Sequence, residues 1–384
     1  METTKTLINE ETRSKANLFC DDIETYTIAQ VNRLMQQAAF KDSYIALMPD
    51  AHPGYLAPIG FTATVPLSNP ILPNIISSDA GCGITMYQVK IKKDWDKLDK
   101  VIRDCVPSDK HKNFDVFNTD QYDLLGLYAS LNCRKYIPAD KFLKAIGTLG
   151  YGNHFIELGK SLNSDTYYLT VHSGSRTIGK LVTDYYTEIA YKNNNTKHME
   201  LAALYDPDTI AEYLDDISVL VKYAIINRRV ILNTICKEMD WKPLGNEINV
   251  VHNYYKRVLD KLVIRKGAIA ATKYSSIAIP INARDGIILG KTISDSINSK
   301  WNYSMPHGAG RTVNRNGASS MITMAQYKKD MQGIHSPSVC KKTLSESPAV
   351  YRDINKIIKA IEDNVQITDI IKPLYNYKTI GEGK

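Results

Sequence analysis

The chain has 384 residues, of which 43% are hydrophobic and 23% charged, and its formal net charge is +7. This composition is typical of a globular protein with a sizeable core, and the mild positive charge gives weak support to a polyanionic partner. The N-terminal segment METTKTLINEETRSK has no apolar core, so no signal peptide is visible. No apolar stretch reaches the roughly 18 residues of a membrane span, so no membrane association is expected.

Short strands, Gly-rich loops and amphipathic helices follow one another along the chain. Alternating or β-branched runs predict strands over residues 61–67, 84–91 and 167–171. Residues 180–192 and 219–239 have the pattern of helices, with the first joined to the second by an Asn-rich link. A last amphipathic helix is predicted over 349–363, with Arg352, Lys356 and Lys359 on its outer side.

The mixture of strands and helices predicts an α/β or α+β fold. Motifs rich in Gly and polar residues extend from about residue 48 to 311, which favours one intertwined catalytic domain over the whole chain, 1–384. The segment at about 180–245 is interpreted as a helical insertion within that domain. Six widely spaced cysteines without a CxxC pair indicate reduced thiols and a cytoplasmic location.

The eight histidines are unevenly placed. His52, His154, His172 and His307 occur in segments rich in Gly or small residues, where a scaffold commonly presents reactive groups. His252 lies in VVHNYYKR, a segment with a helix-like pattern. Single histidines are usually structural or exposed, and we keep that interpretation for His111 and His198, which lie in polar, Lys-rich segments. His335 is left undecided, with a surface position favoured.

Asp79 and Cys82 occur together in SSDAGCGIT, directly before a predicted strand. A carboxylate and a thiol in a Gly-bounded turn can point into one space, although a buried structural cysteine is the simpler alternative. With several histidines they make a plausible divalent-metal site. Thiolate and imidazole favour zinc, whereas a carboxylate and a phosphate substrate make manganese reasonable, and one shared ligand would allow two metals.

Two arginines are candidates for phosphate or RNA contacts. Arg176 follows a Ser-Gly-Ser loop in HSGSR, and Arg311 ends HGAGR. A guanidinium suits phosphate well, although either arginine could equally form an ordinary salt bridge. The chain contains no GxxxxGK[ST] motif, so a bound nucleotide would be held differently from one in a P-loop protein.

Seven motifs together resemble the RtcB family of RNA-splicing ligases. In chain order they are MPDAHPGYLAPIG, SDAGCG, GTLGYGNHFIE, VHSGSR, VHNYYKR, RKGA and PHGAGR. The resemblance covers roughly residues 48–378. It implies a single catalytic domain with a distinctive α/β fold and a central metal-lined cleft.

The resemblance also implies a set of ligands. Asp79, Cys82 and His154 would hold one Mn²⁺, and Cys82, His172 and His252 a second, with Cys82 bridging. His307 would attack the α-phosphate of GTP and become guanylylated. The residues implied to contact GTP or GMP are Asn153, His154, Phe155, Ile156, Glu157, His252, Asn253, Pro280, Ile281, Asn282, Ala283, His307, Gly308, Ala309, Gly310, Tyr351 and Lys378.

The implied activity joins an RNA 3′-phosphate or 2′,3′-cyclic phosphate end to a 5′-hydroxyl end through an RNA(3′)pp(5′)G intermediate. Arg176 and Arg311 would contact the RNA, and a monomer is expected. The chain departs from the family pattern where IPINARDGIILG replaces the usual IPGSMGT, with Ile287 at the place of a base-contacting serine. Tyr151 also replaces a glycine in GYGNH. These departures and the shorter length suggest a divergent branch, acting in RNA repair or tRNA splicing.

Two alternatives remain open from the sequence. A metal-dependent phosphodiesterase or phosphatase could use the same ligands without a covalent intermediate on His307. A non-catalytic RNA-binding protein is the other, although it would need none of the metal ligands.

Overall fold

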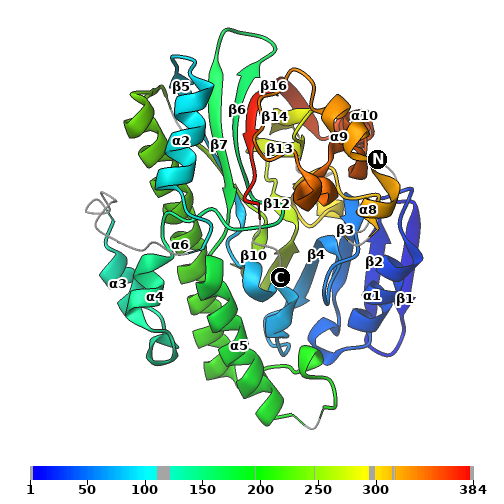
Figure 1. The fold of residues 1–384 in the computed structure, drawn as a ribbon. Coiled ribbons are helices and arrows are strands. Elements are labelled where there is room, and N and C mark those ends of the chain that lie inside the picture. Colours follow the sequence, from blue (N-terminus) through cyan, green and yellow to red (C-terminus); the bar gives the residue numbers. More distant parts are fainter. Residues whose placement is uncertain are drawn as a thin grey trace.

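We analysed a computed structural model of the chain, which describes residues 3–109, 122–194, 196–245, 247–293, 299–313, 315 and 317–380. The described chain is a mixed α/β protein built on two large sheets, as the sequence predicted (Figure 1). In that part of the chain no helix is both long and apolar enough to cross a membrane.

The smaller of the two large sheets forms the lower right of Figure 1. Within the described residues it has six strands, in the spatial order β1 (Lys5–Asn9), β2 (Ser14–Leu18), β3 (Tyr44–His52), β4 (Ile59–Pro66), β11 (Lys261–Lys266) and β10 (Asn253–Val258). All neighbours pair antiparallel except β2 and β3, which are parallel. The sheet therefore brings the motif at the end of β3 beside segments about 200 residues further along the chain.

The larger sheet occupies the top centre of Figure 1. Its strands follow the spatial order β13 (Ser276–Asn282), β14 (Gly286–Thr292), β16 (Val365–Tyr377), β6 (Phe155–Ser161), β7 (Tyr167–Ser173), β5 (Gly83–Lys90) and β8 (Lys242–Pro243), with β9 (Ile248–Val251) also paired to β5. A two-stranded ribbon of β12 (Ala268–Ala270) and β15 (Ser304–Pro306) completes the strands described. The long C-terminal β16 places Asn376 directly opposite Glu157 of β6.

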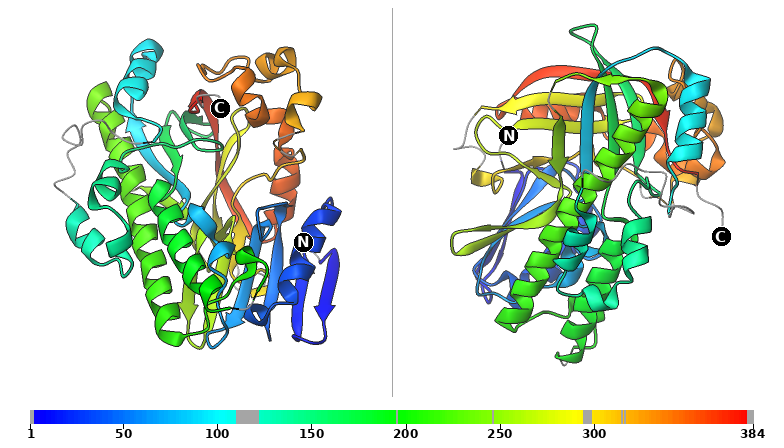
Figure 2. Two further views of the ribbon diagram at one scale, coloured as in Figure 1. Left: turned by 60° about the horizontal axis from the view of Figure 1, so that its bottom comes forward. Right: turned by 90° about the vertical axis from the view of Figure 1, so that its left-hand side faces the viewer.

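Helices cover the outer faces of these sheets. They are α1 (Thr25–Met35), α2 (Trp95–Cys105), α3 (Leu124–Ala129), α4 (Ala139–Lys144), α5 (Arg176–Lys192), α6 (Pro207–Met239), α8 (Ala318–Met321), α9 (Met324–Asp330) and α10 (Ile354–Ile361). The longest, α6, begins with Pro207 and a side-chain cap from Asp206, and ends where Asp240 adopts a left-handed conformation. Figure 2 shows α6 running along the large sheet with α5 beside it.

Most predicted elements are confirmed. The strands expected over 61–67, 84–91 and 167–171 are β4, β5 and β7, and the helices expected over 180–192 and 219–239 fall within α5 and α6. The helical character of the 180–245 segment is therefore present, although α6 also buries a long face that includes Asn227 and Arg228. Its status as an insertion, and the domain limits, stay predictions.

Three local predictions were wrong. The VVHNYYKR segment is extended, because His252 lies between β9 and β10, and pairing with β5 and β11 overrides its helix-like pattern. The C-terminal helix is shorter than 349–363 and begins only at Ile354, where Asp353 provides the cap. Arg352 precedes that helix and is only 5% exposed, so it does not belong to a basic outer face.

Candidate metal and nucleotide site

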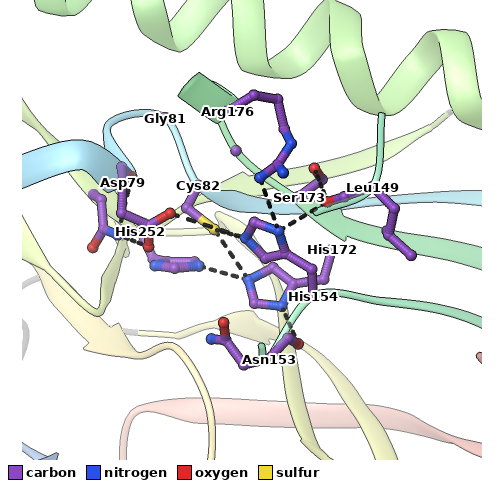
Figure 3. Close-up of polar contacts among 12 residues, drawn as sticks. Asp79, Gly81, Cys82, Leu149, Asn153, His154, His172, Ser173, Arg176 and His252 are labelled. Atoms are coloured by element: carbon purple, nitrogen blue, oxygen red, sulfur yellow. Dashed lines mark hydrogen bonds and ion pairs between the residues drawn. The ribbon is translucent and has the colours of Figure 1, made fainter. Parts of the chain in front are cut away.

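Two overlapping groups of potential metal ligands meet where the large sheet approaches β10. One consists of Asp79, Cys82 and His154, and the other of Cys82, His172 and His252, with the ligand atoms in each group within 4.8 Å of one another. Cys82 belongs to both groups. The side chains converge from separate segments of the chain (Figure 3). These are the two ligand sets that the family resemblance implied.

The distances in the cluster suit metal coordination. Cys82 Sγ lies 3.4 Å from His154 Nε2 and 3.3 Å from His172 Nε2. His172 Nε2 lies 3.1 Å from His252 Nε2, and Asp79 Oδ1 lies 4.0 Å from His154 Nε2. Ligands bound at roughly 2.0–2.3 Å to one tetrahedral ion would lie about 3.3–3.8 Å apart. The spacing therefore needs little adjustment to close around an ion.

The protonation chemistry of the cluster also fits a cation. Burial holds the pKa of His154, His172 and His252 well below the usual range, so each ring is neutral and keeps a lone pair. His154 Nδ1 lies 2.9 Å from Leu149 O and His172 Nδ1 lies 3.2 Å from Asn153 O, which directs both Nε2 atoms inward. Burial raises the pKa of the Cys82 thiol, and a bound cation would favour its thiolate form.

Tight backbone packing fixes the loop that carries Asp79 and Cys82. Cys82 O accepts a hydrogen bond from His252 N at 2.9 Å, and Gly81 N donates to Asn253 O at 2.8 Å. Gly81 has φ +75°, and a Cβ there would lie 2.8 Å from Ala224 Cβ and 2.9 Å from Leu220 O of α6. Only glycine combines this conformation with such close contact. The Gly-rich motif thus allows the loop before Cys82 to pack closely against α6.

His307 lies beside the cluster and is held by Asp50. The centroids of the His252 and His307 rings are 4.7 Å apart. His307 Nδ1 lies 2.7 Å from Asp50 Oδ2, which also accepts hydrogen bonds from the backbone N–H groups of His307 and Gly308. Gly267 of RKGA makes room for the ring, because a Cβ there would lie 3.1 Å from His307 Cε1. The Asp50 carboxylate therefore faces Nδ1, and Nε2 is the ring nitrogen that this carboxylate leaves open.

A cavity of about 850 Å³ opens beside His307. Its size is within the range of small-molecule sites. Asp79, His172 and His252 line one part, whereas Glu157, Tyr351 and Lys378 line another. The cavity thus extends from the candidate metal ligands to a region lined by a carboxyl group, a tyrosine ring and a lysine.

Comparison with known proteins shows which family the chain belongs to. A profile of the RtcB family, described as tRNA-splicing ligase RtcB, matches residues 30–132 and 129–379. The chain belongs to the RtcB family. The predicted resemblance and the predicted fold class are therefore confirmed.

Several RtcB proteins are similar to the chain over most of their length. The RNA-splicing ligase RtcB1 of an Escherichia coli strain is 26% identical over 84% of this chain and 87% of that protein. The tRNA-splicing ligase RtcB of Aeropyrum pernix is 25% identical over 90% of each chain. The tRNA-splicing ligase RtcB of Nanoarchaeum equitans is 23% identical over 83% of this chain and 84% of that protein. These identities are modest, which agrees with a divergent member of the family.

Most residues predicted to contact the nucleotide line the cavity. They are Asn153, Phe155, Glu157, His252, Asn253, Pro280, Ile281, Asn282, Ala283, His307, Gly308, Ala309, Gly310, Tyr351 and Lys378. The side chain of Ile156 does not, because alternation along β6 turns it into the core while its neighbours face the cavity. His154, a member of the ligand cluster, is also outside the cavity lining. Ile287, at the variant segment, is part of the lining.

The two arginines predicted to bind RNA are engaged within the protein. Arg176 donates to Thr148 Oγ1 at 3.1 Å and to Ser108 O at 3.0 Å. Arg311 donates to Val313 O and Ser345 O, and lies 3.5 Å from Glu346. Arg311 lines the cavity, so it can still influence a ligand there, whereas Arg176 supports the loop before His154. Their RNA contacts stay predictions.

Sequence reasoning gave no role to several residues in or beside the cavity. Asp50 was present in the MPDAHPG motif, but its partner His307 lies 257 residues away. Glu346 is 3% exposed and lies 3.3 Å from Lys378 Nζ and 2.7 Å from Arg315. No motif marks Glu346. Lys266 of RKGA was within a quoted motif, and burial lowers its pKa to about 8.

The remaining histidines lie apart from the ligand cluster. His52 is the last residue of strand β3, is buried and lines the cavity, with Nδ1 2.9 Å from Asp50 O. His198 is exposed, as expected, and lies near Glu200. His335 is half-buried between Trp95 and Tyr375 and lies 3.2 Å from Asp99. His111 lies outside the described residues.

Proposed function

We propose that this protein is an RNA ligase that joins 3′-phosphate or 2′,3′-cyclic phosphate ends to 5′-hydroxyl ends, using GTP and two Mn²⁺ ions. The observation that carries the proposal is the position of His307, between the paired ligand groups and a nucleotide-sized cavity. The names of the similar RtcB ligases support RNA as the substrate. A simple hydrolase would not need a histidine nucleophile at this place.

Asp79, Cys82 and His154 would hold one ion, and Cys82, His172 and His252 the other. When bound, such ions supply positive charge that stabilises phosphoryl groups during transfer. A thiolate shared by both sites and a carboxylate in one of them suit Mn²⁺ as well as zinc, and phosphate chemistry favours Mn²⁺.

His307 supplies the nucleophile in this proposal. Its Nε2 forms a bond to the α-phosphorus of GTP while the bond to the leaving pyrophosphate oxygen breaks, which gives a histidine–GMP phosphoramidate. The Asp50 carboxylate stabilises the positive charge that develops on the ring, because it lies 2.7 Å from Nδ1.

Two further transfers complete the reaction. An oxygen of the RNA 3′-phosphate bonds to the phosphorus of GMP and the P–N bond to His307 breaks, which forms RNA(3′)pp(5′)G. The 5′-hydroxyl oxygen of the second RNA end then bonds to the RNA phosphorus, GMP leaves, and the hydroxyl proton passes to solvent. A 2′,3′-cyclic phosphate is first opened by water to the 3′-phosphate.

The walls of the cavity support guanine as the base. Glu157 is 2% exposed, and its Oε1 has no hydrogen-bond partner among the described residues. Guanine presents two adjacent donors, N1–H and N2–H, that a carboxylate can accept, whereas adenine has an acceptor at N1. Lys378 Nζ, 3.3 Å from Glu346, can approach the O6 and N7 acceptors. These groups provide a basis for GTP preference despite the IPINARDG segment.

The site also indicates where the protein works. None of the six cysteines is paired, and coordination through Cys82 requires a free thiol. Both candidate ligand groups and the cavity are complete within a single chain, so their assembly does not require a second subunit. We therefore propose a monomer in a reducing, cytoplasmic environment.

Incubation with α-labelled GTP and Mn²⁺, followed by denaturation, tests the covalent step. We expect acid-labile label on the wild-type protein and none on His307→Ala. His198→Ala is the matched control, since His198 is exposed and distant from the ligand cluster, and it should label normally. Label that persists on His307→Ala, or wild-type protein that never labels with any divalent metal, would refute the guanylylated histidine.

A second assay separates the ligase from the phosphodiesterase alternative. RNA that carries a 2′,3′-cyclic phosphate and a 5′-hydroxyl should become joined only when GTP is present. A phosphodiesterase or phosphatase would instead process the 3′ end without GTP and without joining the strands.

A further inference from the structure

Two consecutive residues of α6, Asn227 and Arg228, are polar and 0% exposed. They lie on the side of α6 that faces the loops carrying the candidate metal ligands. Neither residue is itself a candidate ligand. A buried polar side chain must use its donors and acceptors, so the identity of its partners shows what it holds.

Arg228 connects the segments on both sides of Cys82 and His172. Its Nη1 donates to Gly81 O at 2.9 Å and to Ser173 O at 2.8 Å. Gly81 immediately precedes Cys82, and Ser173 immediately follows His172 (Figure 3). Nη1 of Arg228 therefore fixes the backbone next to Cys82, which belongs to both ligand groups, and next to His172, which belongs to the second group.

The other nitrogens of Arg228 fix the strands beneath the site. Nε donates to Thr85 Oγ1 at 2.9 Å, and Nη2 donates to Asn249 Oδ1 at 3.0 Å. Thr85 Oγ1 in turn donates to Asn249 Oδ1 at 2.9 Å. Since Thr85 lies on β5 and Asn249 on the paired β9, this network holds the strands that lead to Cys82 and His252.

Asn227 holds the segment that precedes His154 by a similar set of hydrogen bonds. Its Nδ2 donates to Thr148 O and to Ser173 Oγ, both at 3.0 Å, and its Oδ1 accepts from Thr148 N at 3.1 Å. Ser173 Oγ donates to Leu149 O at 2.7 Å. That same carbonyl lies 2.9 Å from His154 Nδ1, so the chain of contacts ends on the ring of a candidate ligand.

The charge of Arg228 also distinguishes it from an ordinary structural arginine. Among the described residues, no carboxylate lies within ion-pair distance of it, whereas its neighbour Arg229 pairs with Glu247. Burial lowers the pKa of Arg228 to about 10, so the group remains charged at neutral pH. An unpaired buried cation is costly, and the acidic groups close enough to act on it are Cys82 and Asp79 on the ligand loop together with Glu247.

We infer that Asn227 and Arg228 are positioning residues that hold the metal-ligand loops in the geometry needed to bind two ions. The inference rests on the proposed metal-dependent function. It assigns a role in metal affinity to α6, whose own residues contact neither the ions nor the nucleotide. Groups that orient metal ligands commonly change affinity about 10–100-fold when they are removed.

The test is metal binding measured separately from catalysis. Co²⁺ titration reports thiolate coordination through its charge-transfer absorption, and calorimetry gives the Mn²⁺ affinity. We expect Arg228→Met and Asn227→Ala each to weaken metal binding by about 10-fold or more and to reduce the absorption from Cys82. Arg228→Lys keeps the charge but cannot reach all four acceptors, so it should recover part of the affinity.

Asp216→Asn is the matched control. Asp216 is also 0% exposed on α6, and it accepts hydrogen bonds from the backbone of Asn132 and Cys133 and from Tyr186 Oη, away from the ligand cluster. This variant should lower thermal stability but leave metal affinity unchanged. Variants are compared below their own melting temperatures, so a loss of folding is not mistaken for a loss of affinity.

The outcomes separate the two proposals. Wild-type protein that binds neither Co²⁺ nor Mn²⁺ would refute the proposed function itself. Wild-type binding together with unchanged affinity and absorption in folded Arg228→Met would overturn the positioning role alone. If Arg228→Met does not fold, Asn227→Ala and Arg228→Lys carry the same comparison, and wild-type affinity in both would overturn the inference.

Discussion

Glu157 shows how one buried carboxyl group can serve recognition at a cost in stability. Its Oε2 accepts a hydrogen bond from Asn376 Nδ2 at 2.9 Å, whereas its Oε1 has no partner among the described residues. Burial raises the pKa of Glu157 to about 8, and Asn376 and Lys378 only partly oppose that shift. The folded protein therefore keeps this group protonated at pH values where an exposed glutamate is ionised.

This environment predicts a pH dependence of stability. Because the pKa of Glu157 is higher in the folded state, the folded protein retains a proton that the unfolded chain loses between about pH 4.5 and pH 8. Its contribution therefore lowers stability progressively as pH rises through that window. Glu157→Gln should remove this decline and stabilise the protein at pH 8 by on the order of a few kcal/mol, measured by denaturant unfolding at several pH values.

The same variant should impair GTP recognition. Two donors of a bound guanine would favour the carboxylate form of Glu157, and the neutral amide cannot take that form, so labelling by GTP should fall while thermal stability rises. Glu188→Gln, on the exposed surface of α5, controls for the loss of a single carboxylate. A variant with unchanged labelling would exclude Glu157 from base recognition, and an unchanged pH profile would contradict its buried, protonated state.

At single residues, sequence motifs predicted the ligand cluster well because its members occur in short Gly-rich segments. Asp79, Cys82, His154, His172 and His252 all converge as the resemblance implied. Contacts between distant segments were not predictable in the same way. Glu346 lies in an unremarkable SESP sequence, and only the fold brings it to Lys378. The direction of Ile156 was missed because side-chain alternation requires knowledge of which face of β6 meets the cavity.

At the scale of elements, Arg352 connects the start of α10 to β3 and to the HGAGR loop. Its side chain donates to Ala51 O at 3.0 Å and pairs with Asp22 at 2.9 Å, while its backbone N–H donates to Gly310 O. Asp50, next to Ala51, is the partner of His307. A single arginine therefore stabilises the segments on both sides of the proposed nucleophile.

Replacement of this arginine should destabilise the protein. Arg352→Met leaves buried carbonyl groups of β3 without a donor, which should cost about 2–4 kcal/mol in denaturant unfolding and reduce labelling of His307. Lys356→Ala is a matched control because Lys356 pairs with the same Asp22, at 3.5 Å, but is 65% exposed. An exposed pair of this kind contributes about 1 kcal/mol or less. Equal losses in both variants would contradict the structural role of Arg352.

Sequence periodicity predicted which segments form strands and helices better than it predicted which segments these elements pair with or pack against. The strands β4, β5 and β7 and the helices α5 and α6 follow from local patterns of β-branched or amphipathic residues. Predictions from these local patterns were wrong where tertiary contacts determine the conformation or burial of a residue. His252 lies in extended structure because β9 and β10 pair with other strands, and Arg352 is buried because β3 and the HGAGR loop surround it.

At the scale of the molecule, the candidate metal groups link the major parts of the fold. Cys82 and His154 directly precede β5 and β6 of the large sheet and His172 lies in β7, whereas His252 connects β9, which pairs with β5, to β10 of the smaller sheet. An ion held by Cys82, His172 and His252 would therefore fix the point at which the chain passes from the large sheet to the smaller one. No local sequence pattern contains this relation, because it depends on how strands about 170 residues apart are assembled.

Metal binding should consequently stabilise the whole protein. At a free ion concentration 100 times the dissociation constant, one site stabilises the folded state by about 2.7 kcal/mol. With an unfolding entropy of about 2.1 cal/mol/K per residue, a chain of 384 residues has roughly 0.8 kcal/mol/K, so the melting temperature should rise by about 3 °C for one ion and about 7 °C for two.

Thermal unfolding with EDTA and with Mn²⁺ measures this shift. Cys82→Ser removes the ligand shared by both groups and should abolish most of it, whereas Asp79→Asn weakens only one group and should leave about half. Cys105→Ser, a half-buried cysteine on α2 outside both groups, controls for loss of a thiol and should keep the full shift. A Mn²⁺-dependent rise in melting temperature that survives Cys82→Ser would place the stabilising ion elsewhere, because Cys82 belongs to both ligand groups. It would also remove the structural basis for two metals beside His307.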